Sequence, residues 1–507
     1  MNIINKDGLS DSDVSPGFNK ALNKTLDPND WEKIRLLGHR MVDDMMDLME
    51  HIGKQPVWRQ IPADIKRTYL DPVPLEPSDV DDVYAAFKKE ILPFAKGNIH
   101  PRFFAWVEGT GTPMGVLAEM LGSAMNSNVA IGEHSAMYID AQVVNWCKQL
   151  MQYPEDATGI LLSGASMANI TALNVARNTQ LKKNVRQEGI HAVPGQMVMY
   201  CSAETHSCVQ KAAESIGIGS NAVRRIAVTA NYQIDLPELK LAIETDIAAG
   251  LKPFCVVGNA GTVNTGAIDP LDELAEICRK FNLWLHIDGA FGAIAKMLPE
   301  YSEQLKAIEV ADSVAFDLHK WMYMPYEIAC VLIKDGKAHR ESFANTPSYL
   351  VNADRGLAAG PDPINNFGLE LSRGFKALKV WMSLKEHGLN RYIEVITKNV
   401  LQARYVEQLV QKETELEMLT PVTMNIACYR YIQKDISLQA LNAINKELLV
   451  QLQEQGIASP SSTMLNGIFA IRVCIVNQRT RQSDLDLLIS QSIRIGRECV
   501  RKPAIER

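Results

Sequence analysis

Several features that mark particular classes of protein are missing from this sequence. The nine cysteines are odd in number and contain no Cys-x-x-Cys pair, which argues against a disulfide framework and a zinc knuckle. The ten histidines show no His-Glu-x-x-His spacing, so we expect no metal site. Apolar runs such as residues 328–333 are too short to span a bilayer. These absences favour a reduced, cytoplasmic protein that does not act in a membrane.

Basic residues are not in excess either. The formal net charge is −7, whereas proteins that bind nucleic acid usually present a basic face. We therefore expect no nucleic-acid partner. The polar start of the chain contains an acid within its first residues and is unlike a secretory signal or a transit peptide, so we expect no targeting segment there.

The apolar pattern divides the 507 residues into three parts. Residues 1–95 contain one run of apolar side chains at helical spacing, from about 27 to 52, and then a passage marked by prolines. This helical segment has too little apolar content to fold alone, so we expect it to dock on a partner subunit. Residues 96–385 form the expected large domain and residues 386–507 a small α+β domain.

In the large domain, short apolar runs alternate with amphipathic helices. This alternation is typical of a mostly parallel sheet covered by helices on both faces. The expected strands are residues 195–202, 223–229, 253–258, 283–288, 313–316 and 328–333, and the expected helices are residues 206–218 and 236–249. In the small domain we expect helices at 390–412, 437–455 and 482–500 and strands at 424–432 and 468–476.

The first segment that indicates chemistry is Leu283-Trp-Leu-His-Ile-Asp-Gly-Ala-Phe-Gly292, an apolar strand that ends in Asp288 and continues in small residues. A carboxylate at the carboxyl end of a parallel strand points into the crevice where such sheets bind ligands. The alternative is an aspartate that only caps a loop.

The next expected strand ends in Asp317-Leu-His-Lys-Trp321. A lysine at a strand end beside aromatic groups can have its pKa lowered by burial and become a nucleophilic amine, as Schiff-base chemistry requires. An isolated lysine on a loop is usually solvated. The pairing of Lys320 with Asp288 favours the chemical role.

With these motifs, the chain resembles the group II pyridoxal-phosphate-dependent amino-acid decarboxylases, relatives of aromatic-L-amino-acid, glutamate and histidine decarboxylases, over nearly its whole length. The resemblance implies the α/β fold of the PLP-dependent transferase-like fold type I, with a mostly parallel seven-stranded sheet in the large domain. It also implies an obligate homodimer with sites at the interface. The implied cofactor is pyridoxal 5'-phosphate (PLP), bound to Lys320 as a Schiff base.

The resemblance assigns further cofactor-binding residues. In the segment 159–173, small residues precede a helix start, whose N–H groups and dipole can bind a phosphate; the alternative is a plain turn and cap. Ala165 and Ser166 match the phosphate-binding pair of the family. His206, in Ala-Glu-Thr-His-Ser, matches its ring-stacking histidine, although a lone histidine at a helix start is usually a cap or a surface residue. The remaining assignments are Thr262 beside the cofactor, Asp288 at the pyridine nitrogen, Ala290 against the ring and His319 at the phosphate.

The implied catalytic residues are Lys320, Asp288 and His206. Asp288 keeps the ring nitrogen protonated, so that the ring accepts electrons as the bond from Cα to the carboxylate breaks. The substrate displaces Lys320, loses CO2, is protonated at Cα and leaves as an amine. His206 holds the ring plane and is a candidate for proton transfer.

The substrate is suggested by His100-Pro-Arg-Phe-Phe-Ala-Trp-Val-Glu-Gly109, which corresponds to the substrate-pocket strand of the family. Trp106 stands where the aromatic decarboxylases place an aromatic residue, which favours an aromatic amino acid. Two alternatives stay open. Phe103, Phe104 and Trp106 could simply fill a core, and Arg102 could favour an acidic side chain.

The sequence departs from the family at two positions. Asp317 stands where the aromatic decarboxylases carry a neutral asparagine, and a carboxylate beside a phosphate dianion is repelled. We therefore expect Asp317 to turn away or to pair with a cation. At the position matched to the mobile-loop tyrosine that protonates the carbanion, the chain has Ile364. A gap that restores Tyr349, the nearest tyrosine upstream, or proton donation by His206 are the alternatives.

Four functions are compatible with these residues, and the first is an amino-acid decarboxylase. Without an efficient proton donor, the second is a decarboxylation-dependent oxidative deaminase, which gives an aldehyde, ammonia and peroxide. The third is another PLP lyase, such as one that cleaves a long-chain phosphate substrate. The absence of an extra basic cluster for a second phosphate and of a membrane anchor argues against it. The fourth is a non-enzymatic PLP-binding protein, which has no physical need for a Schiff-base lysine.

Overall fold

The structure, a computed structural model, describes four stretches of the chain. These are residues 22–181, 185–190, 195–345 and 353–501. The chain forms two compact units. The described part of the first unit is residues 22–50 and 62–93, and that of the second is residues 51–61, 94–181, 185–190, 195–345 and 353–501. The separation of an N-terminal segment, a large domain and a C-terminal domain at residues 95 and 385 stays a prediction.

The first unit is helical. Its elements are α2 (Trp31–His51), α3 (Ala63–Thr68), α4 (Val80–Ala86) and the π-helical η2 (Phe87–Ile91). The helix expected between residues 27 and 52 is present as α2. Polar contacts join α2 to α4: the hydroxyl of Tyr84 donates to Asp44 at 2.7 Å, and Lys33 pairs with Asp79 at 2.5 Å. Tyr84 is buried, whereas Lys33 and Asp79 are half-exposed, so their ion pair contributes little to stability.

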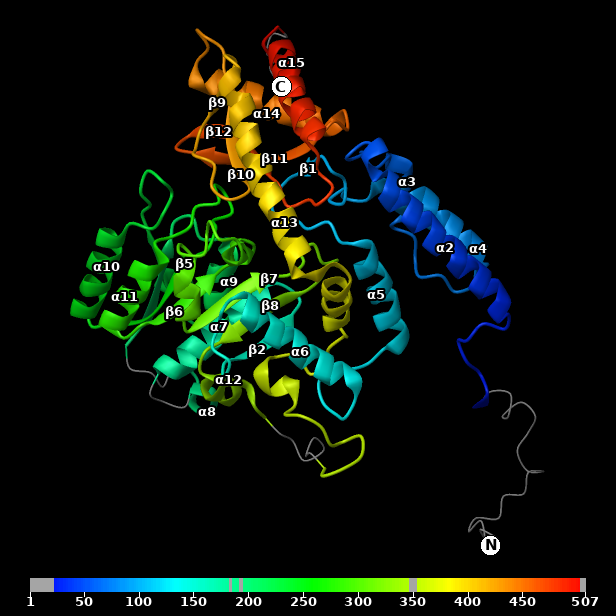
Figure 1. The fold of residues 1–507 in the computed structure, drawn as a ribbon, viewed down its shortest axis with the longest axis horizontal. Helices are drawn as coiled ribbons and strands as arrows, with labels where there is room; N and C mark the ends of the chain where they lie inside the picture. The colour runs from blue at the N-terminus through cyan, green and yellow to red at the C-terminus, as the bar shows by residue number, and fades with distance from the viewer. Residues whose placement is uncertain (1–21, 182–184, 191–194, 346–352, 502–507) are drawn as a thin grey trace. The chain divides into compact units, whose positions relative to one another are not determined.

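A seven-stranded sheet forms the centre of the second unit (Figure 1). The strands lie in the order β2-β8-β7-β6-β5-β3-β4, and all except β8 run parallel to one another. They are β2 (Thr158–Leu162), β3 (Met197–Ser202), β4 (Val223–Ile226), β5 (Lys252–Asn259), β6 (Trp284–Asp288), β7 (Ser313–Asp317) and β8 (Ala329–Ile333). The mostly parallel sheet of seven strands is therefore confirmed.

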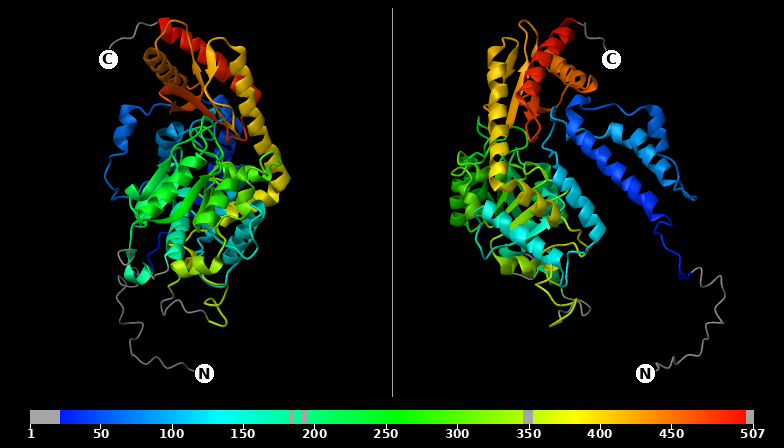
Figure 2. Two further views of the ribbon diagram at one scale, coloured as in Figure 1. Left: turned by 90° about the vertical axis from the view of Figure 1, so that its left-hand side faces the viewer. Right: turned by 45° about the vertical axis from the view of Figure 1, so that its right-hand side comes forward.

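Helices cover both faces of this sheet (Figure 2). One face packs on α6 (Ser135–Leu150), α10 (Leu236–Ala248), α11 (Leu271–Phe281) and the first part of α13 (Ala377–Lys412). The other face packs on α7 (Ala165–Gln180), α9 (Ser207–Ser215) and α12 (Gly336–Phe343). Helix α5 (Pro113–Met125) packs on α13, and short helices lie at α8 (Val185–Glu188), η1 (Ile52–Lys54), η3 (Leu92–Phe94), η5 (Ser220–Ala222), η6 (Gly292–Met297), η7 (Lys306–Glu309) and η9 (Ile364–Phe367).

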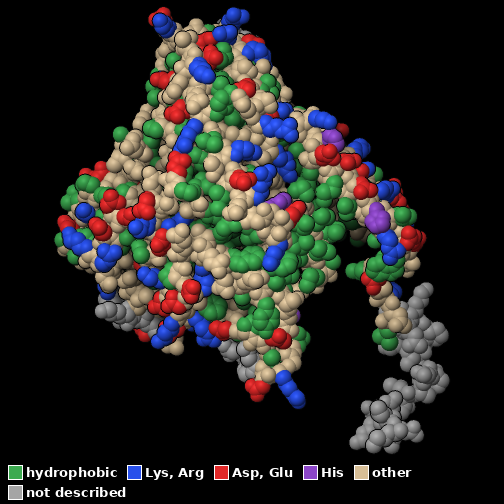
Figure 3. Space-filling model, in the orientation of Figure 1, with side chains coloured by type: hydrophobic (Ala, Val, Ile, Leu, Met, Phe, Trp, Pro, Cys, Tyr) green, Lys and Arg blue, Asp and Glu red, His purple; other side chains and the backbone are tan. Residues whose placement is uncertain are grey.

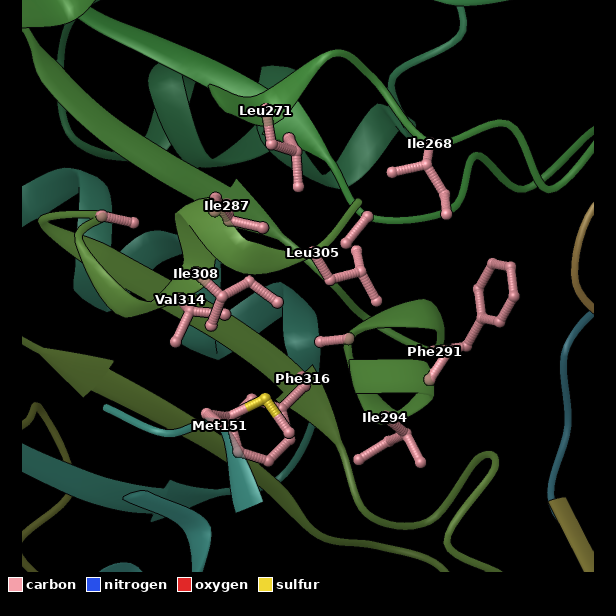
Figure 4. Close-up of a cluster of buried hydrophobic side chains, with 14 of the residues drawn as sticks. Met151, Ile268, Leu271, Ile287, Phe291, Ile294, Leu305, Ile308, Val314 and Phe316 are labelled. Atoms are coloured by element: carbon pink, nitrogen blue, oxygen red, sulfur yellow. The ribbon is translucent and has the colours of Figure 1, made fainter. Parts of the chain in front are cut away.

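The core follows the two-residue period of the strands. In β7, Val314 and Phe316 belong to the cluster on one face, and Ala315 belongs to the cluster on the other. Figure 4 shows part of the first cluster, where Val314 lies beside Ile308 and Phe316 lies beside Met151. Strands buried on both faces explain why these segments read as continuous apolar runs rather than alternating ones.

A second sheet of five strands lies in the C-terminal region of the same unit. Its order is β1-β11-β12-β10-β9, with β1 parallel to β11 and the other pairs antiparallel. The strands are β1 (Phe103–Phe104), β9 (Leu416–Met418), β10 (Ile426–Tyr431), β11 (Ser459–Leu465) and β12 (Ile468–Cys474), and the helices are α14 (Leu438–Glu454) and α15 (Gln482–Arg501). Residues of β1, β9, β10 and β12 pack with α14, α15 and the last part of α13 in the third hydrophobic cluster.

Two details of this region differ from the sequence expectation. The helix expected at 390–412 begins at Ala377, because a second helical stretch precedes it across a break at Gly388. Gly388 has φ 69°, a conformation that side-chain-bearing residues rarely adopt. Strand β11 was not expected, because its Ser-Pro-Ser-Ser-Thr start lacks apolar alternation.

Across the described stretches, no helix combines the length and the apolar character needed to cross a bilayer. All nine cysteines are free thiols, and eight of them are buried.

Candidate active site

A pocket of about 390 Å³ opens at the carboxyl ends of the central strands. Asn259, Asp288 and Asp317 are the last residues of β5, β6 and β7, and all three reach the pocket. This is the edge at which open α/β sheets bind ligands. Every site residue expected from the sequence lines it: Trp106, Ala165, Ser166, His206, Thr262, Asp288, Ala290, His319 and Lys320. Segments that are far apart in the chain therefore meet in one cavity.

Lys320 lies just beyond the end of β7 and pairs with Asp317. Its Nζ is 2.7 Å from Oδ2 of Asp317. Burial lowers the pKa of Lys320, but the carboxylates of Asp317 and Asp288 outweigh that effect, so the pKa is raised. Burial thus lowers the pKa of this amine as expected, but the two carboxylates reverse the net shift. Lys320 is an ammonium here, and it must lose a proton before it can act as a nucleophile.

Asp288 is buried at the floor of the pocket. Its Oδ1 accepts a hydrogen bond from the N–H of Ala290 at 3.1 Å, and its Oδ2 lies 3.8 Å from the thiol sulfur of Cys208. Burial raises the pKa of Asp288, while the positive charge of Lys320 opposes this shift. The cap-only alternative does not describe this aspartate, because its carboxylate faces the cavity. A buried carboxylate in this position can pair with a protonated ring nitrogen.

Asp317 is the last residue of β7, and its side chain reaches the start of α7. Its Oδ1 accepts a hydrogen bond from the N–H of Ala165 at 2.6 Å, while its Oδ2 contacts Lys320. The side chain is 1% exposed. Of the two expectations, pairing with a cation is correct and turning away is wrong. The N–H group that an anion would use at this helix start is therefore held by a carboxylate of the protein itself.

His319 lies between Asp317 and an aromatic ring. Its Nε2 is 3.8 Å from Oδ2 of Asp317, and its Nδ1 lies 2.9 Å from the carbonyl oxygen of Ile328. The ring of Tyr326 lies against it, with 4.3 Å between the centroids. Burial lowers the pKa of His319, although Asp317 opposes this.

His206 is a helix cap and a pocket residue at the same time. As the N-cap of α9, its Nδ1 accepts a hydrogen bond from the N–H of Cys208 at 3.2 Å. Burial lowers the pKa of His206, so the neutral ring is favoured. The cap that seemed an alternative to the ring-stacking role is thus the feature that fixes the orientation of the imidazole at the pocket.

The last two candidates, Thr262 and Trp106, differ in their surroundings. Thr262 is buried, and its hydroxyl is 3.1 Å from that of Thr265. Trp106 is 53% exposed, and Nζ of Lys96 lies 4.5 Å from its ring centroid. By contrast, Phe103 and Phe104 are buried in the interior. The core-filling alternative is therefore right for the two phenylalanines and wrong for Trp106.

Several lining residues were not found from the sequence. They are Tyr326, Glu108, Asn259, Phe291 and Cys208, together with small neighbours. Tyr326 lies in the turn between Lys320 and β8, and burial raises its pKa. Glu108 pairs with Lys96 at the side of the pocket that Trp106 lines. The position of Tyr326 shortly after the lysine was a usable signal, whereas nothing local marked Glu108.

Arg102 does not reach the pocket. Its Nε donates to the carbonyl oxygen of Ile457 at 2.7 Å, and its guanidinium lies 3.5 Å from the carboxylate of Asp484. An arginine that is held by these groups is not available to select an acidic substrate. That alternative is therefore wrong.

Ile364 also lies away from the pocket lining. It is the first residue of η9, its N–H donates to the carbonyl oxygen of Ala130 at 2.9 Å, and its side chain packs against two hydrophobic clusters. This residue has the contacts of a packed turn. Tyr349 lies outside the described residues, so the identity of the proton donor stays open.

The geometry can be compared with known proteins. Residues 62–432 match the family described as the pyridoxal-dependent decarboxylase conserved domain. The chain belongs to this family. It is 35% identical to an aromatic-L-amino-acid decarboxylase of Bacillus atrophaeus, over 90% of this chain and 93% of the relative. It is also 28% identical to a phenylacetaldehyde synthase of Petunia hybrida, over 94% of this chain and 96% of the relative.

A solved structure agrees with this assignment. The structure of Catharanthus roseus tryptophan decarboxylase in complex with L-tryptophan has a TM-score of 0.84 and 26% identity, covering 93% of this chain and 100% of that one. The protein is thus a PLP-dependent amino-acid decarboxylase, as the family resemblance implied. The fold type I expectation is confirmed as well.

The residues present fit the cofactor. The start of α7 offers an N–H that already binds an anionic group, Asp288 offers a buried carboxylate for a ring nitrogen, and Lys320 offers an amine between them. The protein must bind the phosphate, the ring nitrogen and the aldehyde of PLP. Ala165 would bind the phosphate, Asp288 the ring nitrogen and Lys320 the aldehyde.

Proposed function

We propose that the substrate of this decarboxylase is an aromatic L-amino acid, which is released as its amine together with CO2. The observation that carries this proposal is that three aromatic side chains, Trp106, Phe291 and Tyr326, line the pocket. Trp106 is half exposed rather than committed to a core, so it can contact a ligand. The names of the relatives, aromatic-L-amino-acid decarboxylase and tryptophan decarboxylase, support the same substrate class.

We assign the catalytic roles to Lys320, Asp288 and His206. When PLP is bound, its ring supplies the electron sink for the carbanion left by CO2. Asp288 would hold a proton on the ring nitrogen, because burial raises the pKa of this carboxyl and so favours a positively charged partner beside its carboxylate. Lys320 binds the cofactor covalently and yields to the amino group of the substrate. His206, fixed by its cap bond, holds the ring plane.

The remaining site residues bind the cofactor in this proposal. Ala165 and Ser166 hold the phosphate at the start of α7, where the helix dipole favours negative charge. His319 lies beside the same helix start, since its Cε1 is 3.8 Å from the position that a Cβ on Gly164 would take. Thr262 and Ala290 complete the walls next to the ring.

We also propose that the active form is a homodimer. Helix α5 buries Gly115 and Ala118, yet Met120, Leu121 and Met125 are each about half exposed. Figure 3 shows apolar side chains gathered over this part of the molecule. Exposed apolar area of this kind marks a protein–protein contact, and the family resemblance favours a second copy of this chain.

The compartment proposed is the cytoplasm, where the enzyme would act in amino-acid metabolism. Nine cysteines that are all free thiols suit a reducing environment. Fractionation with compartment markers tests this; recovery in a secreted or membrane fraction would contradict it.

A second candidate product is an aldehyde. Phenylacetaldehyde synthases are among the relatives, with 28% identity for the Petunia hybrida protein. In this reaction oxygen oxidises the carbanion before it is protonated, and the products are aldehyde, CO2, ammonia and hydrogen peroxide. The two products differ only in the fate of one carbanion, so the same site residues serve both.

One experiment separates these functions. The purified enzyme is incubated with each of the twenty amino acids, and CO2, amine and peroxide are followed together. CO2 and amine from tryptophan, tyrosine or phenylalanine alone are the expected result. Equal peroxide and CO2 would favour the aldehyde product, and turnover restricted to acidic amino acids would overturn the aromatic assignment.

The site itself is tested by covalent chemistry. Reduction with borohydride should fix PLP on Lys320 in the native enzyme and leave no fixed cofactor in Lys320→Ala. The matched control is Lys376→Ala, which removes a lysine paired with Glu327 outside the pocket lining and should retain the link. A link that survives in Lys320→Ala would refute the site.

A further inference from the structure

Asp317 stands between the two groups that PLP must reach. Its Oδ1 holds the N–H of Ala165 at 2.6 Å, and its Oδ2 holds the ammonium of Lys320 at 2.7 Å. The carboxylate is 1% exposed, so water does not compete for either contact. The phosphate-binding end and the covalent end of the proposed site are thus bridged by one side chain of the protein.

These contacts oppose cofactor binding in two ways. A phosphate at the start of α7 needs the N–H that Asp317 occupies, and two anions at one helix start repel each other. An ammonium has no lone pair, so Lys320 cannot attack an aldehyde while it stays protonated. The carboxylate of Asp317 contributes to the raised pKa of that lysine.

We propose that Asp317 is an internal competitor for the cofactor phosphate and the acceptor of the Lys320 proton during cofactor capture. The inference rests on the site residues proposed above. In the cofactor-free enzyme the carboxylate fills the anion position and keeps the lysine unreactive. When PLP enters, the negative charge of its phosphate beside the carboxylate favours the neutral acid, and the proton moves from Nζ to Oδ2, the nearest base.

This single proton shift resolves both conflicts. The neutral acid no longer repels the phosphate and can donate its O–H to it, while the amine regains its lone pair. Nitrogen then bonds to the aldehyde carbon, and the aldehyde oxygen leaves as water with the two hydrogens of the amine. No oxidant or reductant is required.

The geometry of the neighbours supports this assignment. His319, the other base near Lys320, has its Nδ1 next to the backbone of Ile328, and its Nε2 is 3.8 Å from the Asp317 carboxylate. The two oxygens of Asp288 contact the N–H of Ala290 and the thiol of Cys208. Asp317 is therefore the carboxylate in direct contact with the amine.

The test compares Asp317→Asn with the native enzyme by the dissociation constant of PLP, measured on cofactor-free protein by absorbance and fluorescence. The amide keeps the size of the side chain but carries no negative charge and accepts no proton. We expect PLP to bind at least about tenfold more tightly to Asp317→Asn, because no carboxylate then competes with the phosphate. Equal or weaker binding of PLP would overturn the proposal.

Pyridoxal, which lacks the phosphate, separates the two effects. Pyridoxal gains from a more reactive Lys320 but not from the loss of a negative charge beside the phosphate position, so its affinity should rise less than threefold in Asp317→Asn. Inorganic phosphate should raise the melting temperature of cofactor-free Asp317→Asn more than that of the native protein. An equal gain for pyridoxal and PLP would overturn the competition at the phosphate.

Two further variants secure the interpretation. Asp312→Asn makes the same change at a largely buried carboxylate that accepts the N–H of Leu285 at 2.8 Å, away from the pocket lining, and should leave the PLP constant unchanged. Asp317→Ala also frees Ala165 and must shift PLP binding in the same direction. Failure of these expectations refutes only the role of Asp317, since the reducible link to Lys320 tests the site independently.

Discussion

The thiol sulfur of Cys208 lies 3.8 Å from Oδ2 of Asp288, so a weak donor from the start of α9 touches the carboxylate at the end of β6. The N–H of Ala290 holds the other oxygen at 3.1 Å. Both contacts leave the carboxylate directed at the pocket. They orient the group that we assign to the ring nitrogen.

We predict that Asp288→Asn lowers kcat by about a hundredfold or more, because an amide does not stabilise a proton on the ring nitrogen. The cofactor should stay attached to Lys320, so the reducible link persists. Cys208→Ala is the control: it removes only a weak contact and should change kcat less than about fivefold. A kcat for Asp288→Asn within tenfold of the native value would contradict the assigned role.

The double position of His206, at the α9 cap and at the pocket, allows its functions to be separated. His206→Asn keeps a good N-cap but loses the ring, and we predict a dissociation constant for PLP about tenfold higher. His206→Phe keeps a ring but loses the cap, and should cost about 1 kcal/mol of stability. Equilibrium binding and thermal melting measure the two effects. If both variants behaved alike, the cap and the stacking role would not be distinct.

Product analysis can locate the proton donor. We predict that Tyr349→Phe lowers the rate of amine formation by about a hundredfold and raises peroxide, because the carbanion then waits for oxygen. Ile364→Val should cost only about 1 kcal/mol of stability and leave the product unchanged, since Ile364 is a packing residue. Amine, aldehyde and peroxide are assayed together. An unchanged product ratio in Tyr349→Phe would indicate that His206, not Tyr349, donates the proton to the carbanion.

The apolar surface of α5 predicts how the dimer can be weakened. Met120→Asp places a charge where a partner would cover the helix, and should raise the dimer dissociation constant about tenfold or more. Leu401→Asp is the control, because Leu401 is similarly exposed on α13. Analytical ultracentrifugation gives both constants. A dimer that resisted the first change as well as the second would place the interface elsewhere.

Stability should depend on pH through Asp140. Burial raises the pKa of this carboxyl from 3.8 to about 6, although Arg373 lies 3.6 Å away. The native state therefore holds this proton more tightly than the unfolded state between about pH 4 and pH 6, and loses stability as the pH rises through that window. Relative to Asp140→Asn, the native protein should lose about 2 kcal/mol between pH 4 and pH 7.

Urea unfolding at several pH values measures this difference. Asp362→Asn, which removes an exposed carboxylate paired with Arg340, serves as the control and should vary with pH by less than about 1 kcal/mol. A difference between native and Asp140→Asn that stayed constant with pH would show that Asp140 is ionised throughout.

The sequence by itself determined six of the seven strands of the central sheet, all except β2, and the two groups at its edge. Apolar runs separated by amphipathic helices required parallel strands, and parallel strands place their carboxyl ends on one side. Asp288 and Lys320 lie at or just after such ends, so their meeting followed from local pattern and topology. The family resemblance added Ala165, Ser166, His206, Thr262, Ala290, His319 and Trp106, all of which line the same pocket.

The tertiary structure alone decided what these residues contact. No local pattern shows that Asp317 bonds the N–H of Ala165, because the two residues are joined only through the packing of α7 on the sheet. The same holds for Arg102, which is held by Ile457 and Asp484 from the C-terminal region. Sequence periodicity specifies which face of an element is buried. Charge and hydrogen-bond partners depend on which elements meet, and that is set by the packing of the whole unit.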